Sequence, residues 1–164
     1  MTPSPTPHPT PPALERPVTF GTLDGSELGD GVVATLLYFV VGVAVLGLGF
    51  LALDLLTPGN LRRQVYTDRK PNAAILLAAN HLALAVIVVT AIMTSSDSLL
   101  QGLVDSAVYG VLGVVLQAVA LRVLDAFVPG HLRAIVDEER MSGAAWAVAA
   151  SLLAIGVVNA AALS

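Results

Sequence analysis

Four long stretches of the chain contain almost only apolar residues. They run over 31–56, 72–94, 102–127 and 143–164, and the few charged residues within them lie close to their ends. A helix of about 20 apolar residues crosses a hydrocarbon core roughly 30 Å thick. A surface helix of a soluble bundle needs a polar stripe facing water, and none of the four stretches has one. The sequence therefore predicts an all-α membrane protein with four transmembrane helices.

The composition agrees with this class. The chain has 164 residues, of which 55% are hydrophobic and 12% charged, and its mean hydropathy is +0.80. Soluble domains carry about 25% charged residues. The absence of cysteine excludes disulfides, thiolate metal sites and cysteine nucleophiles. A net charge of −4 with scattered Lys and Arg residues argues against a nucleic-acid partner, so the expected partner is the lipid bilayer.

Residues 1–30 differ in kind from the rest of the chain. They begin MTPSPTPHPTPP and contain few apolar residues. Such a segment cannot bury enough surface to fold, and we expect a disordered, proline-rich tail. It has neither the basic region nor the apolar core of a signal peptide.

The chain also contains an internal repeat. A shift of 71 positions places Asp54 on Asp125, Arg62 on Arg133, and Pro58-Gly59 on Pro129-Gly130. These polar matches predict two tandem units, 31–97 and 98–164, with two spans each. Because each unit has an even number of spans, both enter the membrane in the same direction, as parallel repeats do.

The two long loops, 57–71 and 128–142, should therefore lie on one side of the membrane. Most of the basic residues of the chain lie in these loops: Arg62, Arg63, Arg69, Lys70, Arg133 and Arg140. Positively charged loops stay in the cytoplasm, so we expect the loops inside and both termini outside. Each loop is predicted either as a short amphipathic helix at the headgroups or as a solvated charged segment.

Polar residues within the spans are candidates for function. Asn80, His81 and Gln117 lie near the midplane, and Asn159 lies farther toward the outer face. We expect Asn80 or His81 to hydrogen-bond with Gln117 across helices, which satisfies groups that lipid cannot. The alternative is a polar path in which His81 titrates.

Other polar residues lie at the edge of the hydrocarbon. Asp54 and Asp125 are expected to end their helices rather than to relay protons, and Arg122 either reaches the interface or pairs with Asp125 at the i,i+3 spacing. Small residues recur at every fourth position in two spans, at Gly102, Ser106 and Gly110 and at Ala150 and Ala154. Such faces bring helices together within one chain or in a homo-oligomer.

No catalytic motif is present. The chain has no P-loop, HExxH or GxSxG sequence, and its three histidines lie in the tail, a span and a loop. We therefore expect neither an enzyme nor a cofactor or metal site.

The string from Leu53 to Arg62, its copy from Leu124 to Arg133 and the alanine-rich helix after each resemble domain-of-unknown-function family 350, the YjfL-like bacterial inner-membrane proteins. The resemblance covers about residues 31–164. It implies a multi-pass protein of the bacterial plasma membrane with no established activity and an accessory role in envelope maintenance. It implies no catalytic residues.

Two functions remain open. The first is a non-enzymatic scaffold or accessory subunit that contacts a protein partner through loops 57–71 and 128–142. The second is a small oligomeric channel or carrier in which His81 and Gln117 face the axis.

Overall fold

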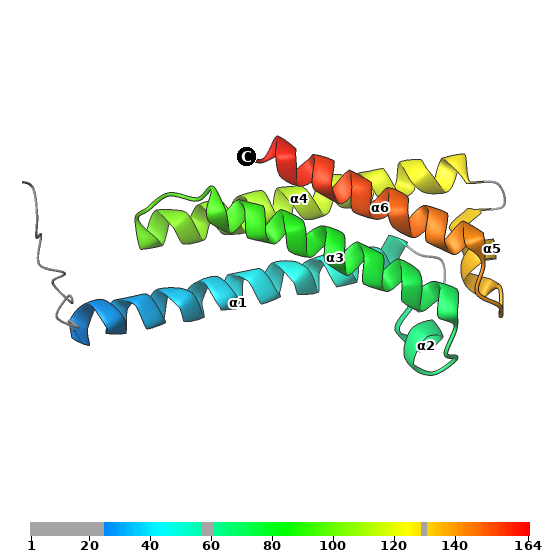
Figure 1. Cartoon of the computed structure of the whole chain (residues 1–164), viewed down its shortest axis with the longest axis horizontal. Coiled ribbons are helices and arrows are strands. Elements are labelled where there is room, and N and C mark those ends of the chain that lie inside the picture. The colour runs from blue at the N-terminus through cyan, green and yellow to red at the C-terminus, as the bar shows by residue number, and fades with distance from the viewer. Residues whose placement is uncertain (1–24, 57–60, 129–130) are drawn as a thin grey trace, which may run out of the picture.

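The computed structural model describes residues 25–56, 61–128 and 131–164, and all the regular structure in these ranges is helical. Four helices are long and apolar enough to cross a membrane: α1 (Gly25–Leu56), α3 (Pro71–Met93), α4 (Leu99–Phe127) and α6 (Gly143–Ala162). Two short helices, α2 (Leu61–Tyr66) and α5 (His131–Asp137), lie at one end of the elongated bundle (Figure 1). The all-helical class with four candidate spans is confirmed.

Three of the four spans begin and end within a few residues of the predicted bounds, whereas α1 begins earlier. The tail predicted for residues 1–30 is wrong over 25–30, which form the start of α1. With 32 residues, α1 is about 48 Å long, well beyond the roughly 30 Å of a hydrocarbon core. Glu27 in its first turn is favourable there because a helix N-terminus carries partial positive charge. Residues 1–24 lie outside the described part of the chain.

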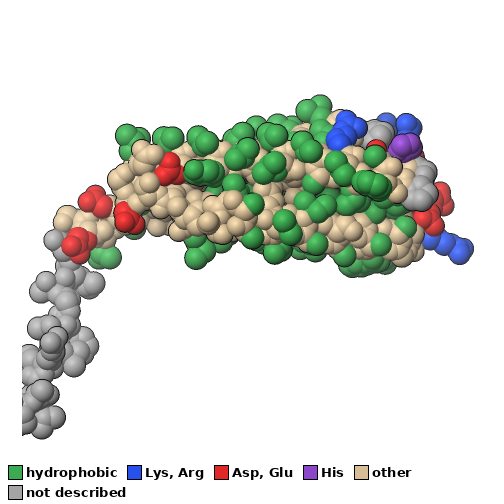
Figure 2. All heavy atoms as spheres, turned by 90° about the horizontal axis from the view of Figure 1, so that it is seen from above, with side chains coloured by type: hydrophobic (Ala, Val, Ile, Leu, Met, Phe, Trp, Pro, Cys, Tyr) green, Lys and Arg blue, Asp and Glu red, His purple; other side chains and the backbone are tan. Residues whose placement is uncertain are grey.

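The long helices pack in two main pairs. α3 packs along α6 and α1 along α4, and α3 also contacts both α1 and α4, whereas α1 and α6 make no comparable contact. Apolar side chains fill one core beside α2 and α5 and a second core farther along the bundle. The flank of the bundle is covered with exposed apolar side chains, and the Lys and Arg side chains visible in Figure 2 gather at one end. This surface is suited to lipid along its length and to water at its ends.

Small residues bring the helices close together, but not all at the predicted positions. Gly102, Ser106 and Gly110 are buried, and a Cβ at Gly110 would lie 3.0 Å from Cγ2 of Val45 on α1. In α6, however, Ala150 and Ala154 are exposed, so of the two uses predicted for this face they do not serve packing within the chain. The close contact of α6 is made instead by Gly156, where a Cβ would lie 2.8 Å from the Cα of Ala83. Because α6 is apolar all round, residue spacing alone does not distinguish its packed face from its lipid face.

Candidate functional site

One aspartate attaches each short helix to the long helix before it. Asp54 Oδ1 accepts a hydrogen bond of 2.8 Å from the N–H of Leu61, and Asp125 Oδ1 accepts one of 2.7 Å from the N–H of Leu132. These N–H groups lie in the first turns of α2 and α5, where a helix offers them no internal partner. A carboxylate at this position also interacts favourably with the helix dipole. Each aspartate thus joins the end of its own span to the start of the short helix that follows.

The predicted ion pair between Arg122 and Asp125 is absent from the described residues. Arg122 is exposed and has no carboxylate of that part of the chain within 4.0 Å. Asp125 is turned toward α5, where its second oxygen lies 3.6 Å from Nδ1 of His131. Arg122 and Asp125 do not pair because the Asp125 carboxylate instead accepts a hydrogen bond from the backbone of α5.

Asn72 fixes the loop after α5. Its side chain is fully buried, and Nδ2 donates to the carbonyl oxygens of Ile135 at 3.0 Å, Glu138 at 3.2 Å and Arg140 at 2.9 Å. Its Oδ1 accepts a hydrogen bond of 3.0 Å from the N–H of Ser142. One side chain of α3 thus binds four backbone groups of the segment 135–142, which we call the clamped loop.

A cluster of charged side chains lies beside the clamped loop. Lys70 donates a hydrogen bond to Asp137, and Arg133 Nε lies 3.5 Å from the other oxygen of Asp137. The hydrogen bond from Lys70 lowers the pKa of Asp137 below its usual value, and Arg133 lowers the pKa further. Arg62, which matches Arg133 at the 71-residue spacing, is exposed and has no carboxylate within 4.0 Å among the residues described.

Two buried amides join α4 to α6. Gln117 Nε2 donates to the carbonyl oxygen of Leu152 at 3.1 Å, and Asn159 Nδ2 donates to that of Gly113 at 2.9 Å. In the described part of the chain, the side-chain oxygens of both amides are buried without a hydrogen-bond partner. The amides therefore orient the two helices but keep unused acceptor capacity.

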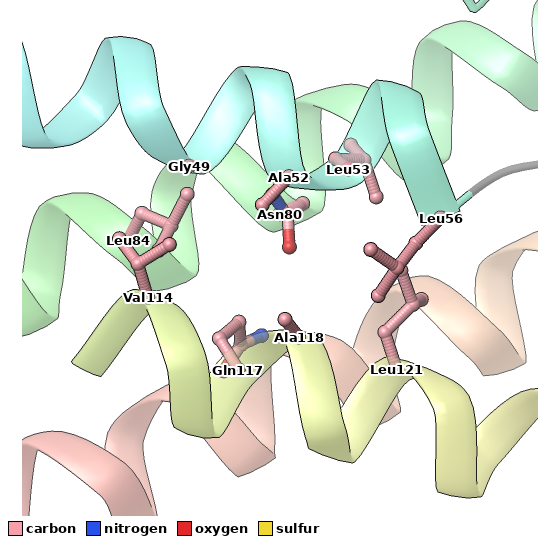
Figure 3. A pocket seen from close by; sticks show the side chains of 10 residues that line it. All are labelled: Gly49, Ala52, Leu53, Leu56, Asn80, Leu84, Val114, Gln117, Ala118 and Leu121. Atoms are coloured by element: carbon pink, nitrogen blue, oxygen red, sulfur yellow. The ribbon is translucent and has the colours of Figure 1, made fainter. Parts of the chain in front are cut away.

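The predicted bond between Asn80 and Gln117 is replaced by a small cavity. Both side chains line a space between α1, α3 and α4, and Figure 3 shows the oxygen of Asn80 pointing into it. The space open to the centre of a water molecule is about 10 Å³, enough for one water. Leu84 and Val114 lie at one end of it and Leu121 at the other (Figure 3). This geometry suits a single bound water better than a hydrated ion.

His81 lies apart from that cavity. Its Nδ1 is 3.0 Å from the carbonyl oxygen of Leu77, and its ring contacts the ring of Phe50 with centroids 5.7 Å apart. It lines an outer groove with α1 and α2, whereas Gln117 faces the interior. The structure therefore does not bring His81 together with Asn80, Gln117 or Asn159 in a single pocket.

Residues 25–56, 61–128 and 131–164 contain no group of three or more metal-ligating side chains. Residues 57–60 and 129–130, which contain the Pro-Gly sequences of the two loops, lie outside the described part of the chain.

The apolar pattern makes Asn72 only the first residue of the span 72–94, and its contacts with the clamped loop were not predicted. A signal existed, because the residue 71 positions later is Gly143. A polar side chain present in only one of two matched positions indicates a contact that the other unit does not make.

The model of the family described as Domain of Unknown Function (DUF350) matches residues 27–163. The chain belongs to this family. The resemblance noted in the sequence is thereby confirmed, and it extends over α1 to α6.

Curated relatives are of nearly the same length. The chain is 49% identical over 147 residues to a UPF0719 transmembrane protein of Mycolicibacterium paratuberculosis, covering 90% of this chain and 97% of that protein. UPF0719 transmembrane proteins of Mycobacterium bovis and Mycobacterium tuberculosis are each 52% identical over the same shares. No solved structure matches the chain. The family is one of uncharacterised transmembrane proteins, which fits the four apolar helices.

Proposed function

We propose that this protein is a non-enzymatic scaffold or accessory subunit of the bacterial plasma membrane, which contacts a protein partner through the charged end formed by α2, α5 and the clamped loop. The observation that carries the proposal is the set of four hydrogen bonds between Asn72 and the clamped loop, three donated and one accepted by its side chain. They give the loop a defined shape before any partner binds. A preorganised surface loses less conformational entropy on binding and therefore binds more tightly.

We also propose that the two halves arose by tandem duplication and that their charged end faces the cytoplasm. The matched bonds of Asp54 and Asp125 support the duplication, since both link the end of a span to the start of a short helix. The gathering of Lys and Arg side chains at that end supports the orientation, because positive loops remain inside (Figure 2). The role in envelope maintenance rests on the family resemblance.

Photo-crosslinking in living cells tests the scaffold. A photoreactive amino acid is placed at exposed Glu139 of the clamped loop and, as a control, at Val158, an exposed apolar residue of α6. We expect a discrete protein adduct from position 139 that weakens when Asn72→Ala is added. Asn80→Ala, a change in the same helix away from the loop, should leave the adduct intact. Adducts that are the same at 139 and 158, or unaffected by Asn72→Ala, would contradict the proposal.

The alternative is a small oligomeric channel or carrier. It is favoured by one observation: Gln117 and Asn80 both line the internal cavity, and the buried side-chain oxygen of Gln117 has no hydrogen-bond partner among the described residues. It is disfavoured by the size of that cavity and by the separate location of His81. His81→Leu and Gln117→Leu decide the matter in proteoliposomes, where proton or solute flux lost in either variant would support the carrier. Flux that is absent or unchanged would eliminate it.

A further inference from the structure

The two short helices have different surroundings although Leu61, Arg62 and Val65 have identical residues at the 71-residue spacing. In α5, Leu132, Ile135 and Val136 are all buried, and Arg133 is engaged with Asp137. α2 packs mainly on α3 and is joined to α1 through the hydrogen bond to Asp54, whereas α5 contacts α3, α4 and α6. Among the described residues, α2 therefore has fewer neighbouring long helices than α5, which leaves more room for a ligand beside α2.

An open groove lies beside α2. Its volume is about 1090 Å³, and it is lined by α1 from Val43 to Leu51, by Arg62 and Tyr66 of α2, and by His81 of α3. The α1 wall is apolar, and its eight-residue rise makes it about 12 Å long. At the α2 end, Arg62, which has no carboxylate within 4.0 Å among the residues described, supplies a positive charge. Tyr66, with 72% of its surface exposed, supplies a hydroxyl group. One end of the groove is therefore cationic, and its α1 wall is hydrocarbon-like.

We propose that this groove binds one anionic glycerophospholipid. Arg62 binds the phosphate, which matches the planar donors of a guanidinium, and Tyr66 donates a hydrogen bond at the headgroup level. One acyl chain lies along the α1 wall. The charge at Arg62 and the apolar wall beside it match the two parts of such a lipid. The proposal does not depend on the scaffold function or on which side of the membrane α2 lies.

The matched half of the protein should not hold a second lipid in this way. At the 71-residue spacing, Tyr66 corresponds to Asp137 and His81 to Leu152, and Arg133 is already beside a carboxylate. An acidic group at the headgroup position repels phosphate. We therefore expect one lipid per chain.

Gly47 allows the groove to be filled without disturbing the protein. It belongs to the α1 wall, and a Cβ added to it would meet no atom within 4 Å. A large side chain at this position should occupy the space of the acyl chain. Val119 of α4, which matches Leu48 and is exposed, offers a lipid-facing control position at equivalent depth.

The test is native mass spectrometry of the full chain released from nanodiscs of phosphatidylcholine and phosphatidylglycerol. We expect one phosphatidylglycerol to remain bound to the wild type and to the controls Arg133→Gln and Val119→Trp. Arg62→Gln should weaken this binding about fivefold, the effect of one interfacial basic group, and Gly47→Trp should abolish it. Inorganic phosphate in excess should not displace the lipid, because it lacks the acyl chain.

Retention of phosphatidylcholine as strong as that of phosphatidylglycerol would overturn the proposal. So would equal effects of Arg62→Gln and Arg133→Gln, or displacement of the lipid by phosphate alone. Circular dichroism and gel filtration of each variant confirm that it is folded. If Gly47→Trp does not fold, Arg62→Gln alone decides the result.

Discussion

The clamped loop leads to a quantitative prediction for Asn72→Asp. Aspartate has nearly the shape of asparagine and keeps an oxygen for the N–H of Ser142. It removes the amide donors, however, and places an oxygen about 3 Å from the carbonyl oxygens that Nδ2 now binds. The change thus replaces attraction with repulsion at one fully buried site.

The magnitude follows from the number of bonds. A buried hydrogen bond contributes about 0.5–1.5 kcal/mol net, and acceptors left without a donor cost more. Asn72→Ala loses the amide donors and the acceptor for Ser142 and should lower the free energy of unfolding by about 2–4 kcal/mol. Asn72→Asp should lower the free energy of unfolding by more than Asn72→Ala does. Its carboxyl group must either stay charged in a buried site or take up a proton at neutral pH, and both cost free energy.

The assay is reversible unfolding in mixed micelles with increasing SDS, together with amide hydrogen exchange. Both variants should unfold at lower SDS fractions than the wild type, and exchange should accelerate in residues 136–142 before it does elsewhere. Asn80→Ala is the control, since Asn80 has no hydrogen bond to the described residues that it would lose. If Asn72→Asp were as stable as the wild type, or Asn80→Ala as damaging as Asn72→Ala, the clamp would not be a structural element.

Three further results are expected. Gly156→Val should destabilise the bundle by about 1–3 kcal/mol or more, because its Cβ meets the backbone of α3. Gly47→Ala should be nearly neutral, since its Cβ meets no atom within 4 Å. If both variants unfolded at the same SDS fraction, the close approach of α6 to α3 would be refuted. Asp54→Ala should lower the free energy of unfolding by about 0.5–2 kcal/mol and speed amide exchange at Leu61, the first residue of α2. Asp54→Asn retains an acceptor and should have a smaller effect on both. Unchanged exchange at Leu61 in Asp54→Ala would show that the carboxylate does not cap α2. Because the pKa of Asp137 is lowered in the folded protein, its pairing stabilises the loop above the unfolded-state pKa and is lost as the pH falls below about 4. Amide exchange of the clamped loop from pH 6 to pH 3 should therefore show a loss of protection that Lys70→Gln reduces, and an identical pH profile in that variant would contradict the pairing.

The sequence predicts the spans and the boundary aspartates because their causes are local. A run of apolar residues long enough for the hydrocarbon core identifies a span whatever its neighbours are. Asp54 and Asp125 lie next to a turn sequence, and the N–H groups they bind are seven residues away. The start of α1 was missed because Gly25–Asp30 are polar and lie beyond the core, where hydropathy has no bearing on helix formation.

Contacts between distant helices could not be predicted in the same way. Asn72 binds groups more than 60 residues away, and nothing near it in the chain indicates this. Gln117 was expected to bond with a side chain, but it binds a backbone carbonyl of α6, an acceptor present at every residue. The packed side of α6 was likewise missed, since Gly156 and Ala154 are equally apolar and only the position of α3 distinguishes them.

Single-cysteine labelling tests most directly whether the chain crosses the membrane four times with both charged loops on one side. The chain has no native cysteine to interfere. Cysteines are placed one at a time at four exposed positions: Tyr66 and Met141 at the α2–α5 end, and Asp97 and Ser164 toward the other. A membrane-impermeant maleimide should label positions 97 and 164 in intact cells, and positions 66 and 141 only after the membrane is permeabilised. Labelling of position 66 and not 141 in intact cells, or the reverse, would contradict four spans with both charged loops on one side.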